Sequence, residues 1–243
     1  MLLRIIFFSL LGSVGSVLAA GAYLWFPRST RERLIPWLIS FATGTLLGVA
    51  FLGLIPEAAA ETGTPVTLHY TLGGIILFFV LEKLVLWRHC HQVDCEVHST
   101  HGPLILMGDA VHNLVDGVVI AAAFLNSPAL GVTAALATIL HEIPQEVGDF
   151  GILLNSGYQP LPALLLNTLS GLATLPGALL GYFFLTPVQN ILPYVLALAA
   201  GSFIYIAAAD LIPTLHQQTS LKISLRQLAF MLAGIVLIVL LHD

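Results

Sequence analysis

The chain has 243 residues, of which 58% are hydrophobic and only 9% are charged. Soluble domains carry about 25% charged residues, so this composition excludes a soluble globular protein and predicts a membrane protein. Eight Lys and Arg residues against thirteen Asp and Glu residues leave no basic surface, which excludes nucleic acid as a partner.

Apolar segments long enough to cross a bilayer follow one another along the whole chain. A transmembrane helix needs about 20 mostly apolar residues, and a helix satisfies its own backbone hydrogen bonds in lipid. Eight segments meet this requirement: Ile5–Phe26, Trp37–Ile55, Thr67–Trp87, Pro103–Phe124, Ala129–Leu154, Pro162–Phe184, Ile191–Ile212 and Ser224–Leu241. We therefore predict an all-α membrane protein in which residues 1–243 form one domain of eight transmembrane helices within the lipid bilayer.

The first segment has a second interpretation as a cleaved signal peptide. Arg4 precedes its apolar core, and Ala19, Ala20 and Gly21 could form a cleavage site. The apolar stretch continues to Phe26, however, and is longer than the apolar core of a usual signal peptide. We expect a retained first helix.

The orientation of the helices follows from the basic residues, which are enriched on the cytoplasmic side of membrane proteins. Seven of the eight fall on one side of the predicted bundle: Arg28, Arg31, Arg33, Lys83, Arg88, Lys222 and Arg226. The connections on the opposite side contain neither Lys nor Arg. We therefore expect a multi-pass protein of the cell membrane or inner membrane, with both termini outside the cytoplasm.

The third segment ends in a polar stretch, residues 88–102, that is rich in histidine. It contains His89, His91, His98 and His101 at irregular spacing, which is typical of a flexible metal-collecting loop rather than of a closed zinc finger. A solvated loop with incidental histidines is the alternative. Just before it, Glu82 and Lys83 are expected to form an ion pair at the cytoplasmic end of the helix.

The fourth and fifth segments hold an unusual concentration of negative charge. They carry five acids and neither Lys nor Arg: Asp109, Asp116, Glu142, Glu146 and Asp149. An ionised carboxylate in the membrane costs several kcal/mol unless it is paired or solvated. Bound cations or protons must therefore compensate this charge.

The spacing of the polar side chains favours a metal site. Asp109, His112 and Asp116 recur at i, i+3 and i+7, which places them on one helix face. On the next helix, His141 and Gln145 form one i, i+4 pair beside a second pair, Glu142 and Glu146. Imidazole, carboxylate and amide ligands suit zinc, iron or manganese.

Two stretches on these helices resemble the ZIP family of divalent metal transporters. They read GDAVHNLVDG at residues 108–117 and HEIPQEVGDF at residues 141–150, and they are most similar to the branch whose fifth helix reads HEIPHELGDF. The resemblance implies a primary metal site formed by His112, Asp116, His141 and Gln145. It also implies an adjacent second site formed by Asn113, Glu142 and Asp116. Gln145 departs from the His or Glu of relatives, which puts bridging of two metals by this residue in doubt.

An internal similarity adds to this interpretation. The second segment ends Leu54-Ile55-Pro56 and the seventh ends Leu211-Ile212-Pro213, while the predicted topology gives these two helices opposite directions. This fits a ZIP-like bundle in which helices 1–3 and 6–8 form an inverted repeat around a central pair of helices, the fourth and fifth.

The leading hypothesis is therefore a transporter, not an enzyme, that moves divalent metal toward the cytoplasm through the site on the fourth and fifth helices. Zinc is the leading substrate, ahead of iron, manganese and cadmium, and no cofactor is expected. Supporting or pathway roles are assigned to Asp109, Glu146, Asp149, Glu57, Asp210 and His216. A homodimer stays open.

Two alternatives to metal transport stay open at this point. The first is an intramembrane zinc hydrolase, since His141-Glu142 begins a sequence like H-E-x-x-H. The second His of that motif is Gln145 here. The other alternative is a proton-coupled carrier that uses the acids as relays, and it could overlap with metal transport.

Overall fold

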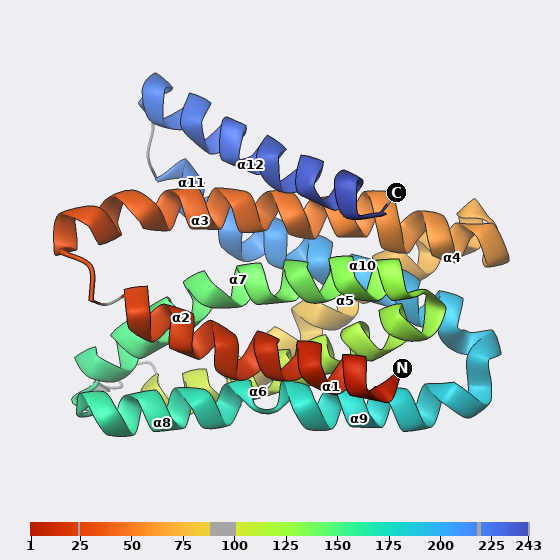
Figure 1. Ribbon diagram of the computed structural model, residues 1–243, viewed down its shortest axis with the longest axis horizontal. Coiled ribbons are helices and arrows are strands. Elements are labelled where there is room, and N and C mark those ends of the chain that lie inside the picture. Colours follow the sequence, from red (N-terminus) through yellow and green to blue (C-terminus); the bar gives the residue numbers. More distant parts are fainter. Residues whose placement is uncertain (24, 88–100, 218–219, 243) are drawn as a thin grey trace.

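The computed structural model describes residues 1–23, 25–87, 101–217 and 220–242, and every regular element in these ranges is helical. The helices lie side by side as one elongated bundle (Figure 1). The first part of the chain forms α1 (Leu2–Leu10), η1 (Leu11–Gly15), α2 (Ser16–Tyr23), α3 (Arg28–Gly48), η2 (Val49–Leu54), α4 (Ile55–Thr62) and α5 (Thr64–Trp87). The remainder forms α6 (His101–Asn126), α7 (Pro128–Asn155), α8 (Pro160–Gly171), α9 (Thr174–Leu185), η3 (Thr186–Ile191), α10 (Leu192–Ile206), η4 (Ala207–Leu211), α11 (Ile212–His216) and α12 (Leu221–His242).

Each of the eight predicted ranges is helical over most of its length. The largest difference concerns the second range, predicted as Trp37–Ile55, because the helical stretch begins at Arg28 and continues through η2 and α4 to Thr62. An apolar stretch marks only the part of a helix that suits lipid, and polar residues extend the same helix beyond it. Residues placed in connections by the sequence therefore form helix ends.

Six stretches of helix in the described residues are long and apolar enough to cross a membrane: Leu2–Tyr23, Arg33–Thr62, Thr64–Leu84, Ile105–Asn126, Pro160–His216 and Leu221–Leu241. The chain is therefore a multi-pass membrane protein. The stretch Pro160–His216 contains the non-helical backbone of Val188, where the chain reverses between α9 and α10 (Figure 1). α7 is not among the six, and its second half carries the polar residues of HEIPQEVGD. Eight crossings stay a prediction.

Glycines bring three pairs of helices into close contact. A Cβ atom on Gly117 of α6 would lie 2.0 Å from the Thr174 carbonyl oxygen of α9, and one on Gly44 of α3 would lie 2.0 Å from the Met231 carbonyl oxygen of α12. A Cβ atom on Gly74 of α5 would meet a carbonyl oxygen of α10 at 2.2 Å. Helix association in membranes depends on such close backbone approach, so these crossings fix the neighbours of each helix.

The helices divide into two groups that share a central core. One group contains α3, α5, α10 and α12, and the other contains α1, α2 and α6–α9, with the most extensive contacts inside each group. The groups meet mainly where α3 crosses α7. The core cluster at this junction is rich in alanine, including Ala122 and Ala123 of α6, Ala134 and Ala137 of α7, and Ala200 of α10. Small side chains thus let α6 and α7 lie close to the other group.

Candidate metal centre

The candidate ligands come from two antiparallel neighbours, α6 and α7. A tight connection joins them, because α6 ends at Asn126 and the Ser127 side chain caps α7 by accepting a hydrogen bond from the Leu130 amide at 3.2 Å. Pro128 occupies the first turn of α7, where a missing N–H costs nothing. The two helices then run side by side, so residues spaced by helical turns on each can face one another.

Four side chains converge between these helices: His112 and Asp116 of α6, and His141 and Glu142 of α7. The Nε2 atoms of the two histidines lie 3.1 Å apart. Asp116 Oδ2 lies 3.3 Å from His141 Nε2, and Glu142 Oε1 lies 3.3 Å from His112 Nε2. The two remaining nitrogen–oxygen pairs, His141 to Glu142 and His112 to Asp116, lie at 3.5 and 3.9 Å.

These distances fit the ligand shell of a small cation. Zinc sites are tetrahedral with bonds of about 2.0–2.1 Å, which gives ligand–ligand edges of about 3.3–3.4 Å. The nitrogen–nitrogen distance and the four nitrogen–oxygen distances in this cluster range from 3.1 to 3.9 Å. Two imidazole nitrogens and two carboxylate oxygens therefore lie at separations close to those between the ligands of a zinc ion.

The surroundings support binding of a positive charge. Asp116 and Glu142 are fully buried and His141 is 1% exposed. Both carboxylate oxygens of Asp116 and Oε1 of Glu142 have no hydrogen-bond partner among the described residues. Such buried unpartnered oxygens are rare and need an explanation, and a cation supplies one. The other ring nitrogen of His141, Nδ1, donates to the Ala137 carbonyl oxygen at 3.0 Å, which directs Nε2 toward the cluster.

Two of the predicted ligands have different contacts. The Gln145 amide donates to Asp109 Oδ1 at 3.1 Å. The Asn113 amide donates to Asp109 Oδ1 at 3.0 Å and to Glu142 Oε2 at 3.4 Å, and its oxygen accepts the Thr174 hydroxyl at 2.7 Å. Both amides hold carboxylates in place. Asp109 and Glu146 also converge with Glu142 in a second cluster of possible ligand atoms.

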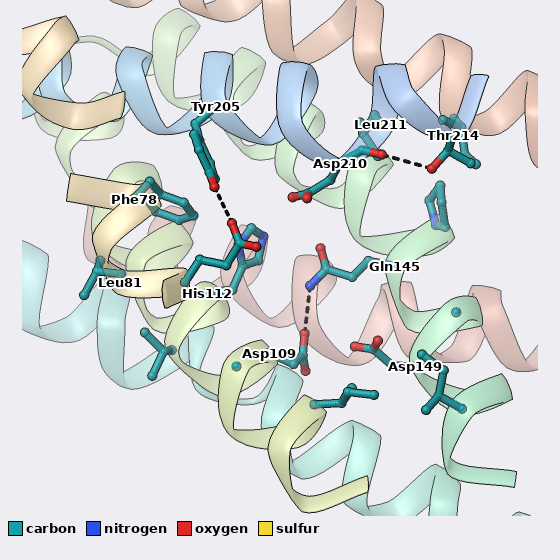
Figure 2. A pocket seen from close by; sticks show the side chains of 18 of the residues that line it. Phe78, Leu81, Asp109, His112, Gln145, Asp149, Tyr205, Asp210, Leu211 and Thr214 are labelled. Carbon is teal, nitrogen blue, oxygen red and sulfur yellow. Dashed lines mark hydrogen bonds between the residues drawn. The ribbon is translucent and has the colours of Figure 1, made fainter. Parts of the chain in front are cut away.

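A cavity of about 820 Å³ reaches the cluster from one end of the bundle. His112, Asp109, Gln145 and Asp149 line it on the side of α6 and α7, as Figure 2 shows, and Asp210 lies on the opposite wall. Among the residues that the structure describes, neither Lys nor Arg lines this cavity. The predicted pathway residues Asp149 and Asp210 are therefore brought into one acidic space with the ligand His112.

Sequence reasoning misassigned Glu82 and missed its partner. Glu82 of α5 accepts a hydrogen bond from the Tyr205 hydroxyl of α10, and both line the cavity (Figure 2). Lys83 instead holds its ammonium group over the Phe79 ring, 5.8 Å from the centroid. The predicted Glu82–Lys83 ion pair is wrong, because adjacent residues on a helix point in different directions. No local signal links Glu82 to Tyr205, which is 123 positions away.

The other predicted residues lie away from this centre. Glu57 accepts a hydrogen bond from the Asn126 amide at 3.1 Å, where α4 meets the end of α6. His216 is exposed at the end of α11 and does not line the cavity. His89, His91 and His98 lie outside the described residues, and His101 is the first residue of α6.

Comparison with known proteins adds to the geometry. Residues 87–242 match the family model described as ZIP Zinc transporter. The chain is similar to zinc transporter ZIP13 of Pongo abelii, with 36% identity over 84% of this chain and 65% of that protein, and to the human ZIP13, with 33% identity over 84% of this chain and 69% of that protein. The Drosophila melanogaster zinc transporter foi is 39% identical over 54% of this chain and 19% of that protein. The chain thus spans about two thirds of the length of these ZIP13 relatives.

Proposed function

The chain belongs to the ZIP zinc transporter family, and we propose from this premise that it transports divalent metal cations across a membrane. Zinc is the leading substrate, with iron, manganese and cadmium as other candidates. One observation carries the proposal: His112, Asp116, His141 and Glu142 bring two nitrogens and two oxygens to zinc-like separations, and all of these side chains except His112 are buried. The relatives are named zinc transporters and not enzymes, and nothing favours the zinc hydrolase interpretation.

The ligand set suits a cation that must be released as well as bound. Two imidazoles and two carboxylates bind borderline divalent metals without the thiolates that hold structural zinc most firmly. Gln145 has its nitrogen directed to Asp109, so its oxygen is the only atom it could offer to the same ion. We therefore assign primary binding to the His112, Asp116, His141 and Glu142 side chains, with Gln145 holding Asp109.

We further propose eight crossings with both termini outside the cytoplasm. Both chain ends lie toward the end of the bundle that holds α4 and the turn between α9 and α10 (Figure 1). α3 and α12 both begin at the opposite end (Figure 1), with Arg33 in the second turn of α3 and Lys222 in the first turn of α12. Basic residues favour the cytoplasmic side, so the end where these helices begin is assigned to the cytoplasm.

The proposed inverted repeat is supported by the glycine contacts. Gly44 lies ten residues before Leu54 of the first Leu-Ile-Pro sequence, and Gly201 lies ten residues before Leu211 of the second. A Cβ atom on either would meet a carbonyl oxygen of the partner helix three residues before that helix's own glycine, at Met231 before Gly234 and at Thr71 before Gly74. The α3–α12 and α5–α10 crossings thus repeat the same register.

The metal ion would move from the end of the bundle that holds both chain termini to the end that we assign to the cytoplasm. The cavity reaches His112 and is lined by Ile105 near the start of α6 and Ile152 near the end of α7, so in this conformation the centre communicates with the end assigned to the cytoplasm. On the other side, the alanine-rich core separates the centre from Glu57. Movement of the α6–α7 group against the other group across this core would expose the centre to the opposite side.

Uptake into proteoliposomes tests the proposal. Zinc uptake by the wild-type chain is expected, and His141→Ala and Asp116→Ala should each reduce uptake at subsaturating zinc at least about tenfold, because loss of a group that holds a metal costs that much in affinity. His69→Ala is the matched control, since His69 is exposed on α5 and bonds only the Pro65 carbonyl oxygen of its own helix. Absence of wild-type uptake of zinc, iron, manganese and cadmium would remove the proposal.

A further inference from the structure

A second group of acidic side chains lies one helical turn from the primary site. Asp109 of α6 and Glu142 and Glu146 of α7 each offer an oxygen, and these three oxygens lie within 4.8 Å of one another. Glu142 and Glu146 are fully buried and Asp109 is 4% exposed. Neither α6, α7 nor the adjacent α8 contains Lys or Arg, so no basic residue of these helices compensates the cluster.

Amide groups hold these carboxylates but leave one oxygen free on each of two of them. Asn113 and Gln145 both donate to Asp109 Oδ1, and Asn167 of α8 donates to Glu146 Oε2. Asp109 Oδ2 and Glu146 Oε1 are buried and have no hydrogen-bond partner among the described residues. Organised carboxylates with free buried oxygens are the arrangement that a cation would complete.

We propose that Asp109, Glu142 and Glu146 form a second divalent-cation position that shares Glu142 with the primary site. The inference rests on the proposed transport function and gives the cation a step between the primary site and the cavity, whose wall includes Asp109. Two metals bridged by one carboxylate are typically about 3.5–4 Å apart. Both positions can therefore be filled at once or in succession.

This position differs from the Asn113, Glu142 and Asp116 site that the family resemblance implies. Asn113 presents its NH2 group to Asp109 and Glu142, and its oxygen is engaged by the Thr174 hydroxyl. A donor group cannot bind a cation, so Asn113 is a positioning residue here. Asp109 and Glu146 supply the oxygens that Asn113 does not.

The two positions differ in chemistry. The primary site combines nitrogen and oxygen ligands, which suits zinc, whereas the second has only carboxylate oxygens and suits harder cations such as manganese. Gly171 of α8 leaves room beside Glu146, because a Cβ atom there would lie 3.0 Å from Glu146 Oε1. The second position should therefore favour Zn²⁺ over Mn²⁺ less strongly than the primary site does.

Titration of the purified full chain with Mn²⁺, followed by electron paramagnetic resonance, tests the second position. The first equivalent should give the hyperfine spectrum of an isolated ion, and the second should broaden it through coupling between neighbouring ions. Glu146→Gln and Asp109→Asn keep side-chain shape but each removes a charge, and both variants should bind one equivalent with an uncoupled spectrum. Glu61→Gln is the matched control and should still bind two ions, because Glu61 is exposed on α4 and belongs to neither cluster.

The outcomes separate this inference from the proposed function. A wild-type chain that transports zinc but binds a single Mn²⁺ overturns the second position alone, as do Glu146→Gln and Asp109→Asn variants that still show two coupled ions. A wild-type chain that binds two coupled ions but transports no metal overturns the proposed function alone. If one variant fails to fold, the other still decides, because Asp109 and Glu146 each belong to the second position and neither belongs to the Asn113, Glu142 and Asp116 set.

Discussion

At the residue scale, His141 uses its two ring nitrogens for different purposes. Nδ1 donates to the Ala137 carbonyl oxygen one turn earlier in α7, and Nε2 lies among the other ligand atoms. Glu142 follows at once and directs Oε1 toward His112, while Oε2 accepts the Asn113 amide. These two candidate ligands are thus each fixed by a second contact, and such contacts orient metal ligands and tune their affinity.

Thr174 provides a test of this support. Its hydroxyl donates to the Asn113 oxygen at 2.7 Å, and Thr174→Val would leave that buried oxygen without its donor at an expense of about 1–3 kcal/mol in stability. Asn113 would then be free to rotate and release Asp109 and Glu142. We expect a lower unfolding temperature and weaker metal binding, measured by thermal denaturation and calorimetric titration. Thr174→Ser keeps the hydroxyl and should retain both; equal loss in the two variants would contradict the role of this hydrogen bond.

Gln145 provides a second test, directed at selectivity. Gln145→His would replace a weak amide ligand by an imidazole beside His141 and would remove the donor to Asp109 Oδ1. Because imidazole favours zinc over manganese, we expect the ratio of zinc to manganese affinity to rise. Competition of the two ions for the purified variant measures the ratio. Gln145→Met removes the donor to Asp109 without adding a ligand, so it separates the loss of this hydrogen bond from the gain of an imidazole. An unchanged affinity ratio in Gln145→His would contradict the prediction that residue 145 lies near the metal.

At the element scale, the helices owe their arrangement to glycine crossings and to local changes in helix type. η2 and η4 are π-helical turns, and each is followed directly by Ile-Pro, at Ile55-Pro56 and at Ile212-Pro213. Proline has no N–H to donate and its ring crowds the preceding turn, and π-turns inside helices are often found at functional sites. A π-helical turn followed by Ile-Pro therefore occurs both between α3 and α4 and between α10 and α11, which are the two stretches that the proposed repeat relates.

Alanine substitution at the paired glycines tests the repeat. A Cβ atom would lie 2.0 Å from the Met231 carbonyl oxygen in Gly44→Ala and 2.2 Å from that of Thr71 in Gly201→Ala. Forcing helices apart in a packed core costs about 1–3 kcal/mol, and we expect similar losses in the two variants, measured as unfolding temperature in detergent. Gly21→Ala is the control, since nothing lies within 4 Å of its Cβ and alanine favours a helix. Clearly unequal losses would count against equivalent crossings.

The sequence predicts elements better than it predicts their contacts. Apolar length marks ranges that are helical over most of their length, and helical spacing places His112 with Asp116 and His141 beside Glu142, because these relations are local. The convergence of Asp109 with Glu146 depends on the register between α6 and α7, and the Tyr205–Glu82 hydrogen bond depends on the α5–α10 crossing. The alignment of α6 with α7 and that of α5 with α10 cannot be predicted from the periodicity of the sequence. Hydropathy also marks only part of α3, whose first turn is polar and begins at Arg28.

At the scale of the whole molecule, one acidic cavity reaches the centre from the end of the bundle where α6 begins. Carboxylates line the cavity from both helix groups, including Asp149 of α7, Asp210 of η4 and Glu82 of α5 (Figure 2). A cavity lined by one sign of charge concentrates counter-ions. The carboxylates of this cavity would therefore attract a cation that leaves the centre and keep it nearby. In the orientation that we propose, a low metal concentration in the cytoplasm would then favour release.

Thiol labelling tests which side this cavity faces. In a chain with Cys90 and Cys95 replaced by serine, Thr214→Cys would place a thiol on the exposed cavity wall, whereas Ala134→Cys would place one in the fully buried core between the groups. A membrane-impermeant maleimide should label Thr214→Cys from the cytoplasmic side only, and Ala134→Cys from neither side while the chain keeps this conformation. Zinc transport must persist in both single-cysteine variants for the comparison to hold. Labelling of Thr214→Cys from the outer side alone would reverse the proposed orientation, because the basic ends of α3 and α12 and the mouth of the cavity would then lie outside the cell.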